Sequence, residues 1–119
     1  MPNPVTHFEI AGKDGKKLQD YYTKLFGWKV DAANPMDYGM VEAQGGHGIG
    51  GGITGTQGGA PGGVTVYVEV DDPQAYLDKA ASLGGKIVMP VTVIPNTVTM
   101  AQFSDPEGNM IGIIKAGSM

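Results

Sequence analysis

The sequence predicts an α+β fold in which a strand–helix–strand–strand–strand (βαβββ) module occurs twice. The stretches "VTHFEI" (5–10) and "GGVTVYVEV" (62–70) alternate apolar and polar residues, which is the period of half-buried strands. Each is followed by a segment in which apolar residues recur at helical spacing, and then by further strand-like segments. The same order of elements therefore occurs in both halves of the chain.

The two halves also match in spacing. The stretch "HFEI…LFGWKV" aligns with "YVEV…LGGKIV". The distance between the anchor residues Ile10 and Val30 differs by two residues from that between Val70 and Val88. Two copies are too few for a solenoid repeat. We interpret 1–119 as one domain of two packed modules, the first at about 1–57 and the second at about 62–119.

In the first module, alternation places His7 and Glu9 on one face of the first strand, opposite to Phe8. The helix that follows, in "GKDGKKLQDYYTKLFGW", ends at Gly27, a residue typical of helix C-termini. Strands are predicted in "WKVDA" and "YGMVEAQ". We expect the aromatic residues in or just after the helix to pack in the core: Tyr21, Tyr22, Phe26 and Trp28.

In the second module, Thr65, Tyr67 and Glu69 share one face of the first strand, opposite a row of valines. Asp72 is placed to cap a helix that begins at Pro73, in "DDPQAYLDKAASLGG". Strands are predicted near "KIVMPVTV", "TVTMAQFS" and "NMIGIIKA", and "DPEGN" predicts a hairpin turn.

The glycine-rich stretch "AQGGHGIGGGITGTQGGAPGG" (43–63) matches the dinucleotide-binding pattern GxGxxG twice, at 46–51 and 50–55. That pattern binds a pyrophosphate where a helix follows it, and the glycines and proline that follow here are unfavourable in a helix. We interpret "HGIGGGIT" as the last strand of the first module and "GTQGGAPGG" as the linker. Glycines in this strand leave room beside the sheet, either for a neighbouring segment or for a ligand.

Composition argues against several partners. The chain has 119 residues, a formal net charge of −4 and no cysteine, and its eight basic residues are all lysines. An acidic chain without guanidinium groups is poorly suited to nucleic acid, and no apolar run approaches the roughly 20 residues that span a bilayer. The N-terminus "MPNPVTHFEI" does not have the basic and apolar regions of a signal peptide. We expect a cytoplasmic protein with no nucleic-acid and no membrane partner.

Three motifs, "LFGW", "VDD…LGGKI" and "F-x-DPEGN", together resemble the vicinal oxygen chelate superfamily. This superfamily includes glyoxalase I, bleomycin-resistance proteins and extradiol dioxygenases, and the resemblance covers nearly the whole chain. It implies two tandem βαβββ modules that form a half-open curled β-barrel around a cavity, with the helices outside. It also implies a homodimer, because small two-module members are typically dimers; the modules pair within a chain or swap between chains.

The resemblance further implies four positions for metal ligands, one on the first and one on the last strand of each module. These positions fall on His7, on Thr65, on a residue within Gly51 to Ile53, and on Gly112. Of these, His7 alone is a usual metal ligand, and a catalytic zinc normally has three protein ligands. We therefore expect no cofactor, with a divalent metal as the less favoured alternative.

Three roles stay open for the polar residues near the first strands. In the first role, these residues (His7, Glu9 and Glu69) line a ligand pocket with polar groups. In the second, His7 forms a general acid–base pair with either glutamate. In the third, all three bind a metal. They are the predicted catalytic residues if the protein is an enzyme. The predicted ligand-binding residues are His7, Glu9, Tyr38, Thr65, Tyr67, Glu69, Gln102 and Gly112.

The sequence thus predicts a protein of the glyoxalase and bleomycin-resistance type that binds a small, largely apolar or aromatic molecule without a metal site. The alternative is a glyoxalase-like isomerase or lyase in which His7 with Glu9 or Glu69 moves a proton, with or without a metal.

Overall fold

A computed structural model describes residues 2–56, 62–95 and 98–117. The chain divides into two compact units. The first unit is His7–Thr65, and the second unit comprises Met1–Thr6 and Val66–Met119. Both boundaries fall inside a strand, and each such strand is assigned to the unit that holds most of its residues. The middle of the predicted linker, 57–61, lies outside the described residues.

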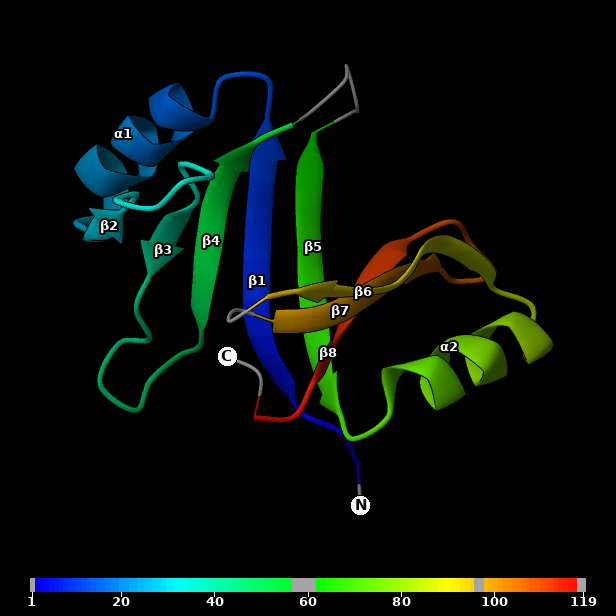
Figure 1. The fold of residues 1–119 in the computed structure, drawn as a ribbon. Coiled ribbons are helices and arrows are strands. Elements are labelled where there is room, and N and C mark those ends of the chain that lie inside the picture. Colours follow the sequence, from blue (N-terminus) through cyan, green and yellow to red (C-terminus); the bar gives the residue numbers. More distant parts are fainter. Residues whose placement is uncertain (1, 57–61, 96–97, 118–119) are drawn as a thin grey trace. The chain divides into compact units, whose positions relative to one another are not determined.

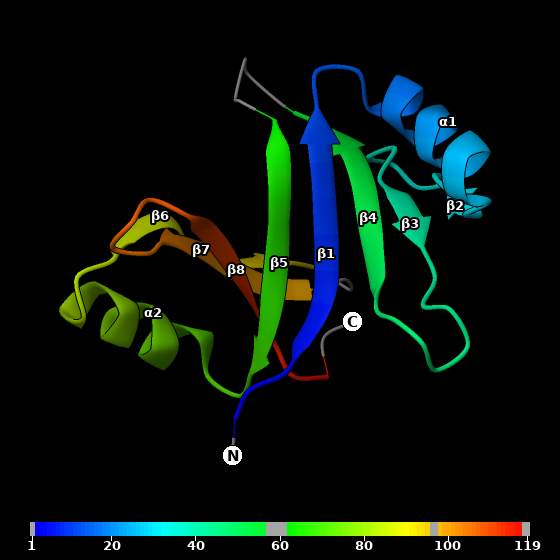
Figure 2. The ribbon, with the colours of Figure 1, turned by 180° about the vertical axis from the view of Figure 1, so that it is seen from behind.

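The first unit is built from one helix and a sheet. Its elements are β1 (Val5–Gly12), α1 (Gly15–Phe26), β2 (Val30–Asp31), β3 (Gly39–Val41) and β4 (Gly50–Gly55). The strands lie in the order β2-β3-β4-β1, and β4 runs parallel to β1 and antiparallel to β3 (Figure 1). The view from behind also shows β1 and β4 side by side (Figure 2). The predicted glycine-rich strand is therefore confirmed from Gly50 onward, where a strand stands in place of the helix that a dinucleotide site requires.

Helix α1 begins where Asp14 accepts a hydrogen bond from the backbone N–H of Lys17 at 3.0 Å, and it ends at Gly27, whose φ of 73° is left-handed. None of its 12 residues, all of which the structure describes, is buried. The expectation of core packing is wrong for Tyr21 and Phe26, which are 57% and 59% exposed. The rings of this region pack against one another instead, edge-on for Tyr21 with Tyr22 and stacked for Tyr22 with Phe26. A helix at the margin of a small sheet finds little apolar surface to cover.

The second unit repeats this order with a better-packed helix. Its elements are β5 (Gly63–Val70), α2 (Pro73–Ser82), β6 (Lys86–Ile94), β7 (Val98–Ser104) and β8 (Met110–Lys115). The strand order is β5-β8-β7-β6, with β5 and β8 parallel and the other neighbours antiparallel. Helix α2 is capped by Asp72 as predicted, and Leu77 packs with Val70, Ala101 and Ile113 in a core between the helix and the sheet.

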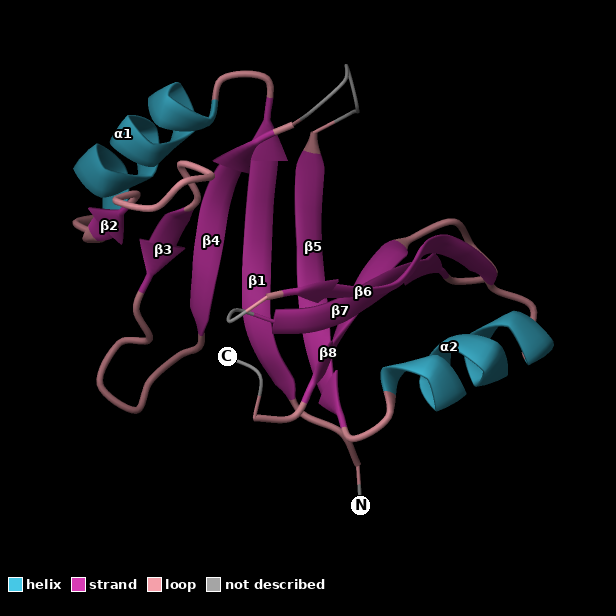
Figure 3. Cartoon of the chain, viewed as in Figure 1, coloured by secondary structure: helices cyan, strands magenta, loops and turns pink. Residues whose placement is uncertain are grey.

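Both units therefore contain a strand, a helix and three further strands, as Figure 3 shows by its colours. This confirms the predicted α+β class and the βαβββ order of both modules. The "DPEGN" turn is also confirmed, since the backbone N–H of Asp105 donates to the carbonyl of Asn109 at 2.9 Å. The N-terminal segment belongs to the second unit, where the carbonyl of Pro4 accepts a hydrogen bond from the N–H of Glu69 at 2.9 Å.

Candidate functional site

The candidate site in the first unit begins with two side chains on one face of β1. His7 is buried and Glu9 is half-buried, and they project from alternate positions of the same strand. Phe8 projects to the other face, where its ring lies 5.6 Å from that of Trp28. The predicted pairing of His7 with Glu9 on one face is therefore confirmed.

Tyr38 connects these two residues. Its hydroxyl lies 2.9 Å from Nε2 of His7 and donates a hydrogen bond to Oε2 of Glu9 at 3.1 Å. A phenol has one proton, so when Tyr38 donates to Glu9 its oxygen accepts from the Nε2–H of His7. The three side chains form one continuous hydrogen-bonded chain.

A clamp on its backbone places Tyr38. Oδ1 of Asn34 accepts a hydrogen bond from the N–H of Tyr38 at 2.9 Å, and Nδ2 of Asn34 donates to the carbonyl of Tyr38 at 2.7 Å. The intervening Asp37 has a φ of 53°, a left-handed conformation that aspartate adopts more readily than most residues. The turn from Asn34 therefore holds the tyrosine at the start of β3.

Gly52 makes room for the ring of Tyr38. It lies opposite Glu9 in the parallel pairing of β1 and β4. A Cβ atom on Gly52 would overlap the ring and hydroxyl of Tyr38. The absence of a side chain at this position is therefore a requirement of the hydrogen-bonded chain.

Burial favours the uncharged forms of His7 and Glu9, the two ionisable ends of the hydrogen-bonded chain. It lowers the pKa of His7 below its ordinary value of 6.5. It raises the pKa of Glu9 above 4.5, and the hydrogen bond from Tyr38 opposes this increase. The two shifts bring the pKa values towards each other, which is a condition for passing a proton between the two groups.

The second unit carries a related arrangement across three strands. Tyr67, Gly112 and Gln102 are register partners on β5, β8 and β7. The ring of Tyr67, which is 2% exposed, occupies the space above Gly112, and Nε2 of Gln102 donates to its hydroxyl at 2.7 Å. A tyrosine thus covers a strand glycine in each unit.

The remaining predicted residues are placed as follows. Thr65 is buried at the end of the first unit, and Glu69 is half-buried in the second unit. Sequence reasoning included Tyr38 among the ligand-binding residues but missed its role as the link between His7 and Glu9. It also missed the role of Asn34, and it included Gly52 only in the implied metal position within Gly51 to Ile53 and among the strand glycines that leave room beside the sheet. Asn34-Pro35 was recognisable as a turn signal, but the direction of the tyrosine after the turn depends on tertiary packing.

The residues present do not fit the metal site that the resemblance implies. In the part of the chain that the structure describes, no three His, Asp or Glu side chains are grouped so that they can hold one metal ion. Gly52 and Gly112 have no side chain that could bind a metal. The ring of Tyr38 occupies the space above Gly52, and the ring of Tyr67 occupies the space above Gly112. Nε2 of His7 is moreover already hydrogen-bonded to the hydroxyl of Tyr38.

Comparison with known proteins finds relatives for nearly the whole chain. Residues 5–113 match the model of the Glyoxalase/Bleomycin resistance protein/Dioxygenase superfamily. "Putative glyoxylase CFP32" of Mycobacterium bovis is 32% identical over 116 residues, which cover 91% of this chain and 44% of that protein. "Anthracycline biosynthesis protein DnrV" of Streptomyces peucetius is 27% identical over 134 residues, covering 99% and 49%. The chain thus spans about half the length of the curated relatives it matches.

The fold is similar to that of solved structures at lower sequence identity. Methylmalonyl-CoA epimerase from Mycobacterium tuberculosis superposes with a TM-score of 0.68 at 15% identity, covering 93% of this chain and 86% of that one. This likeness concerns the arrangement of strands and helices.

Proposed function

Because the chain belongs to the Glyoxalase/Bleomycin resistance protein/Dioxygenase superfamily, we propose that it binds a small, largely apolar or aromatic molecule without a divalent metal. The observation that carries this proposal is the chain His7–Tyr38–Glu9 on one face of the first unit. Small-molecule sites combine apolar and aromatic surface with a few fixed polar groups. Tyr38 supplies both, since it is a half-buried aromatic residue whose hydroxyl is held by two partners.

A ligand screen tests this proposal. An aromatic and antibiotic library is added to the purified protein, the shift in melting temperature is measured, and mass spectrometry checks for a co-purified molecule. The name of the Streptomyces peucetius relative makes anthracyclines the first compounds to include. We expect a ligand whose stabilisation is lost in Tyr38→Ala and kept in Tyr21→Ala, a matched change of an exposed tyrosine. The proposal fails if no compound binds, or if binding is unaffected by the loss of Tyr38.

The second candidate function is that of an isomerase or lyase that moves a proton without a metal. The protons of the hydrogen-bonded chain can be arranged in two ways that both give a total charge of zero. In one, His7 is an imidazolium and Glu9 a carboxylate; in the other, both are uncharged and each hydrogen bond runs in the opposite direction. Tyr38 passes the proton between them, so that either end is ready to take or give a proton at a substrate carbon next to a carbonyl.

Deuterium incorporation tests the enzymatic candidate. Carbonyl compounds with an adjacent proton, including the hemithioacetal of glutathione and methylglyoxal, are incubated with the protein in heavy water and followed by mass spectrometry. We expect exchange into a compound that also binds, at a rate that falls in Tyr38→Phe, which keeps the ring and removes the connecting hydroxyl. We expect no turnover of the hemithioacetal, since that reaction resembles the metal-dependent branch of the superfamily. Equal exchange in the variant would exclude the relay.

Elemental analysis of protein purified without chelators tests metal independence separately. We expect far less than one metal ion per chain. Zinc, nickel, iron or manganese near one per chain, lost in His7→Ala, would overturn this part of the proposal.

We further propose that the protein is a cytoplasmic homodimer. The sheet of the second unit ends in β6, an edge strand with exposed apolar residues: Ile87, Val88 and Val93. Apolar edge strands normally require covering, and twofold pairing is the commonest way for soluble chains to provide it. In the described part of the chain, neither helix has the length and apolar character to cross a membrane.

A further inference from the structure

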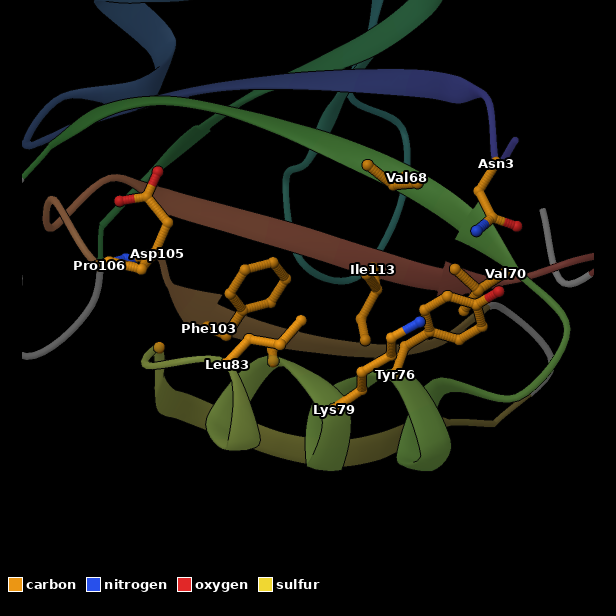
Figure 4. A pocket seen from close by; sticks show the side chains of 12 residues that line it. Asn3, Val68, Val70, Tyr76, Lys79, Leu83, Phe103, Asp105, Pro106 and Ile113 are labelled. Atoms are coloured by element: carbon orange, nitrogen blue, oxygen red, sulfur yellow. The ribbon is translucent and has the colours of Figure 1, made fainter. Parts of the chain in front are cut away.

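The second unit contains an apolar cavity that the proposed function does not use. It has a volume of about 360 Å³ and lies between α2 and the sheet. Val68 and Val70 project into it from β5, on the face opposite to Tyr67 and Glu69. Figure 4 shows its apolar side chains converging from the helix and the sheet: Val68, Val70, Tyr76, Leu83, Phe103 and Ile113.

Small residues on the helix explain why this space is not filled by the protein. Helix α2 buries Pro73 and Leu77, whereas the residue that it presents to the cavity one turn later is Ala80. Leu83, just after the helix, is 69% exposed and lies at the rim. Apolar atoms that line a void lose dispersion contacts, and an apolar ligand of suitable size restores them.

The cavity has one charged side chain at each end, and the two differ in whether the structure already compensates their charge. Asp105 lies at the end near Phe103, and its carboxylate accepts hydrogen bonds from the backbone N–H groups of Glu107 and Asn109, each at 2.9 Å, and from the side chain of Asn109 at 3.0 Å. These donors compensate its charge within its own turn. Lys79 lies at the other end, beside Val70 and Tyr76, where its ammonium borders the apolar wall (Figure 4).

We propose that this cavity is a second binding site, and that its ligand is an amphipathic carboxylate. The apolar chain or ring of the ligand fills the space under α2, and its carboxylate pairs with the ammonium of Lys79. The volume lies within the range of small-molecule pockets, which begins at roughly 300 Å³. The site is on the opposite face of the sheet from Tyr67 and Gln102, and none of the residues that carry the proposed function (His7, Tyr38 and Glu9) lines it.

Decanoate and decanol, used below their aggregation concentrations, test this proposal on the full chain. Both are titrated while methyl signals of Val68, Val70 and Ile113 are followed by NMR. We expect both to shift these methyls, and decanoate to bind more tightly. Lys79→Met keeps the aliphatic stem and should weaken decanoate binding roughly three- to fivefold while decanol is unaffected. Lys24→Met, in the last turn of α1, is the matched control and should leave both affinities unchanged.

A second variant fills the cavity. Ala80→Leu adds apolar atoms from a helical position and should abolish the binding of both compounds. The proposal is overturned if neither compound shifts the cavity methyls, if Lys79→Met weakens both compounds equally, or if the shifts occur instead around His7 and Tyr38.

Discussion

At the scale of single residues, Tyr38 connects the protonation of His7 to that of Glu9 through its hydroxyl. Its hydroxyl contacts both groups, so a change in the charge of one end alters the hydrogen bond at the other. The pKa of His7 is lowered by burial and that of Glu9 is raised by burial. The two residues therefore give the free energy of unfolding opposite dependences on pH.

The sign follows from proton binding in each state. Below 6.5, down to the lowered pKa of His7, the unfolded state binds more protons at this residue, so its contribution to stability falls as pH falls. Above 4.5, up to the raised pKa of Glu9, the folded state binds more protons, so the contribution of Glu9 falls as pH rises.

Single variants should separate these two contributions. Relative to the unmutated protein, we expect Glu9→Gln to gain stability as pH rises from 4.5, and His7→Gln to lose stability as pH rises towards 6.5. Urea unfolding of the three proteins across this range measures the difference. If both variants change in the same direction with pH, the opposite shifts assigned to the pair are wrong.

Gly112 offers a test of the tyrosine–glycine contact in the second unit. A Cβ there would overlap the ring of Tyr67, which is too deeply buried to move aside. We expect Gly112→Ala to lower the free energy of unfolding by about 1–3 kcal/mol, the usual cost of overpacking. Gly48→Ala is the control, because nothing lies within 4 Å of its added carbon. Equal stability of the two variants would contradict the packing described for Tyr67.

At the scale of elements, α1 and α2 are attached to their sheets by different means. Helix α2 buries Leu77 in an apolar core. Helix α1 buries no residue, and its half-buried Gln19 donates from Nε2 to the carbonyl of Ile53 at 2.8 Å and to that of Asp37 at 3.2 Å. One amide therefore joins α1 both to β4 and to the turn that positions Tyr38.

Gln19→Leu should therefore destabilise the protein by about 1–3 kcal/mol, because it leaves the carbonyl of Ile53 without this donor. Gln74→Leu on α2 is the matched control, since Gln74 bonds to Asp78 at an exposed position. Chemical unfolding gives the stability of both variants, and hydrogen exchange should show faster exchange along α1 in the first. An effect of Gln74→Leu as large as that of Gln19→Leu would remove the distinction.

The elements could be predicted from the sequence where the signal is local. Alternation located β1 and β5, and Asp72 with Pro73 marked the start of α2. Helical spacing of apolar residues did not indicate how much surface lies opposite a helix, so the exposure of Tyr21 and Phe26 was not foreseen. Residues from β1, β4 and the Asn34 turn come together at Tyr38, and no local pattern encodes that contact. The cavity under α2 likewise depends on how the side chains of the helix meet those of the sheet, which no local pattern encodes.

At the scale of the whole molecule, the proposed homodimer gives a direct measurement. Light scattering at micromolar concentration should yield about twice the chain mass of 12.4 kDa. A second copy that covers β6 would remove exposed apolar side chains from water, which favours association. A monomer with an intact circular dichroism spectrum would exclude this assembly.

The parallel pairings have a consequence for the order in which the chain folds. His7 pairs with Gly50 and Tyr67 with Gly112, so each unit joins its first strand to its last. Contacts between distant positions form slowly, because the chain entropy of a long loop is lost before the contact is gained. During synthesis, β1 stays without β4 until Gly55 has left the ribosome. Until then its apolar face, including Phe8, is available to other chains, so chaperone binding should concentrate on this early interval.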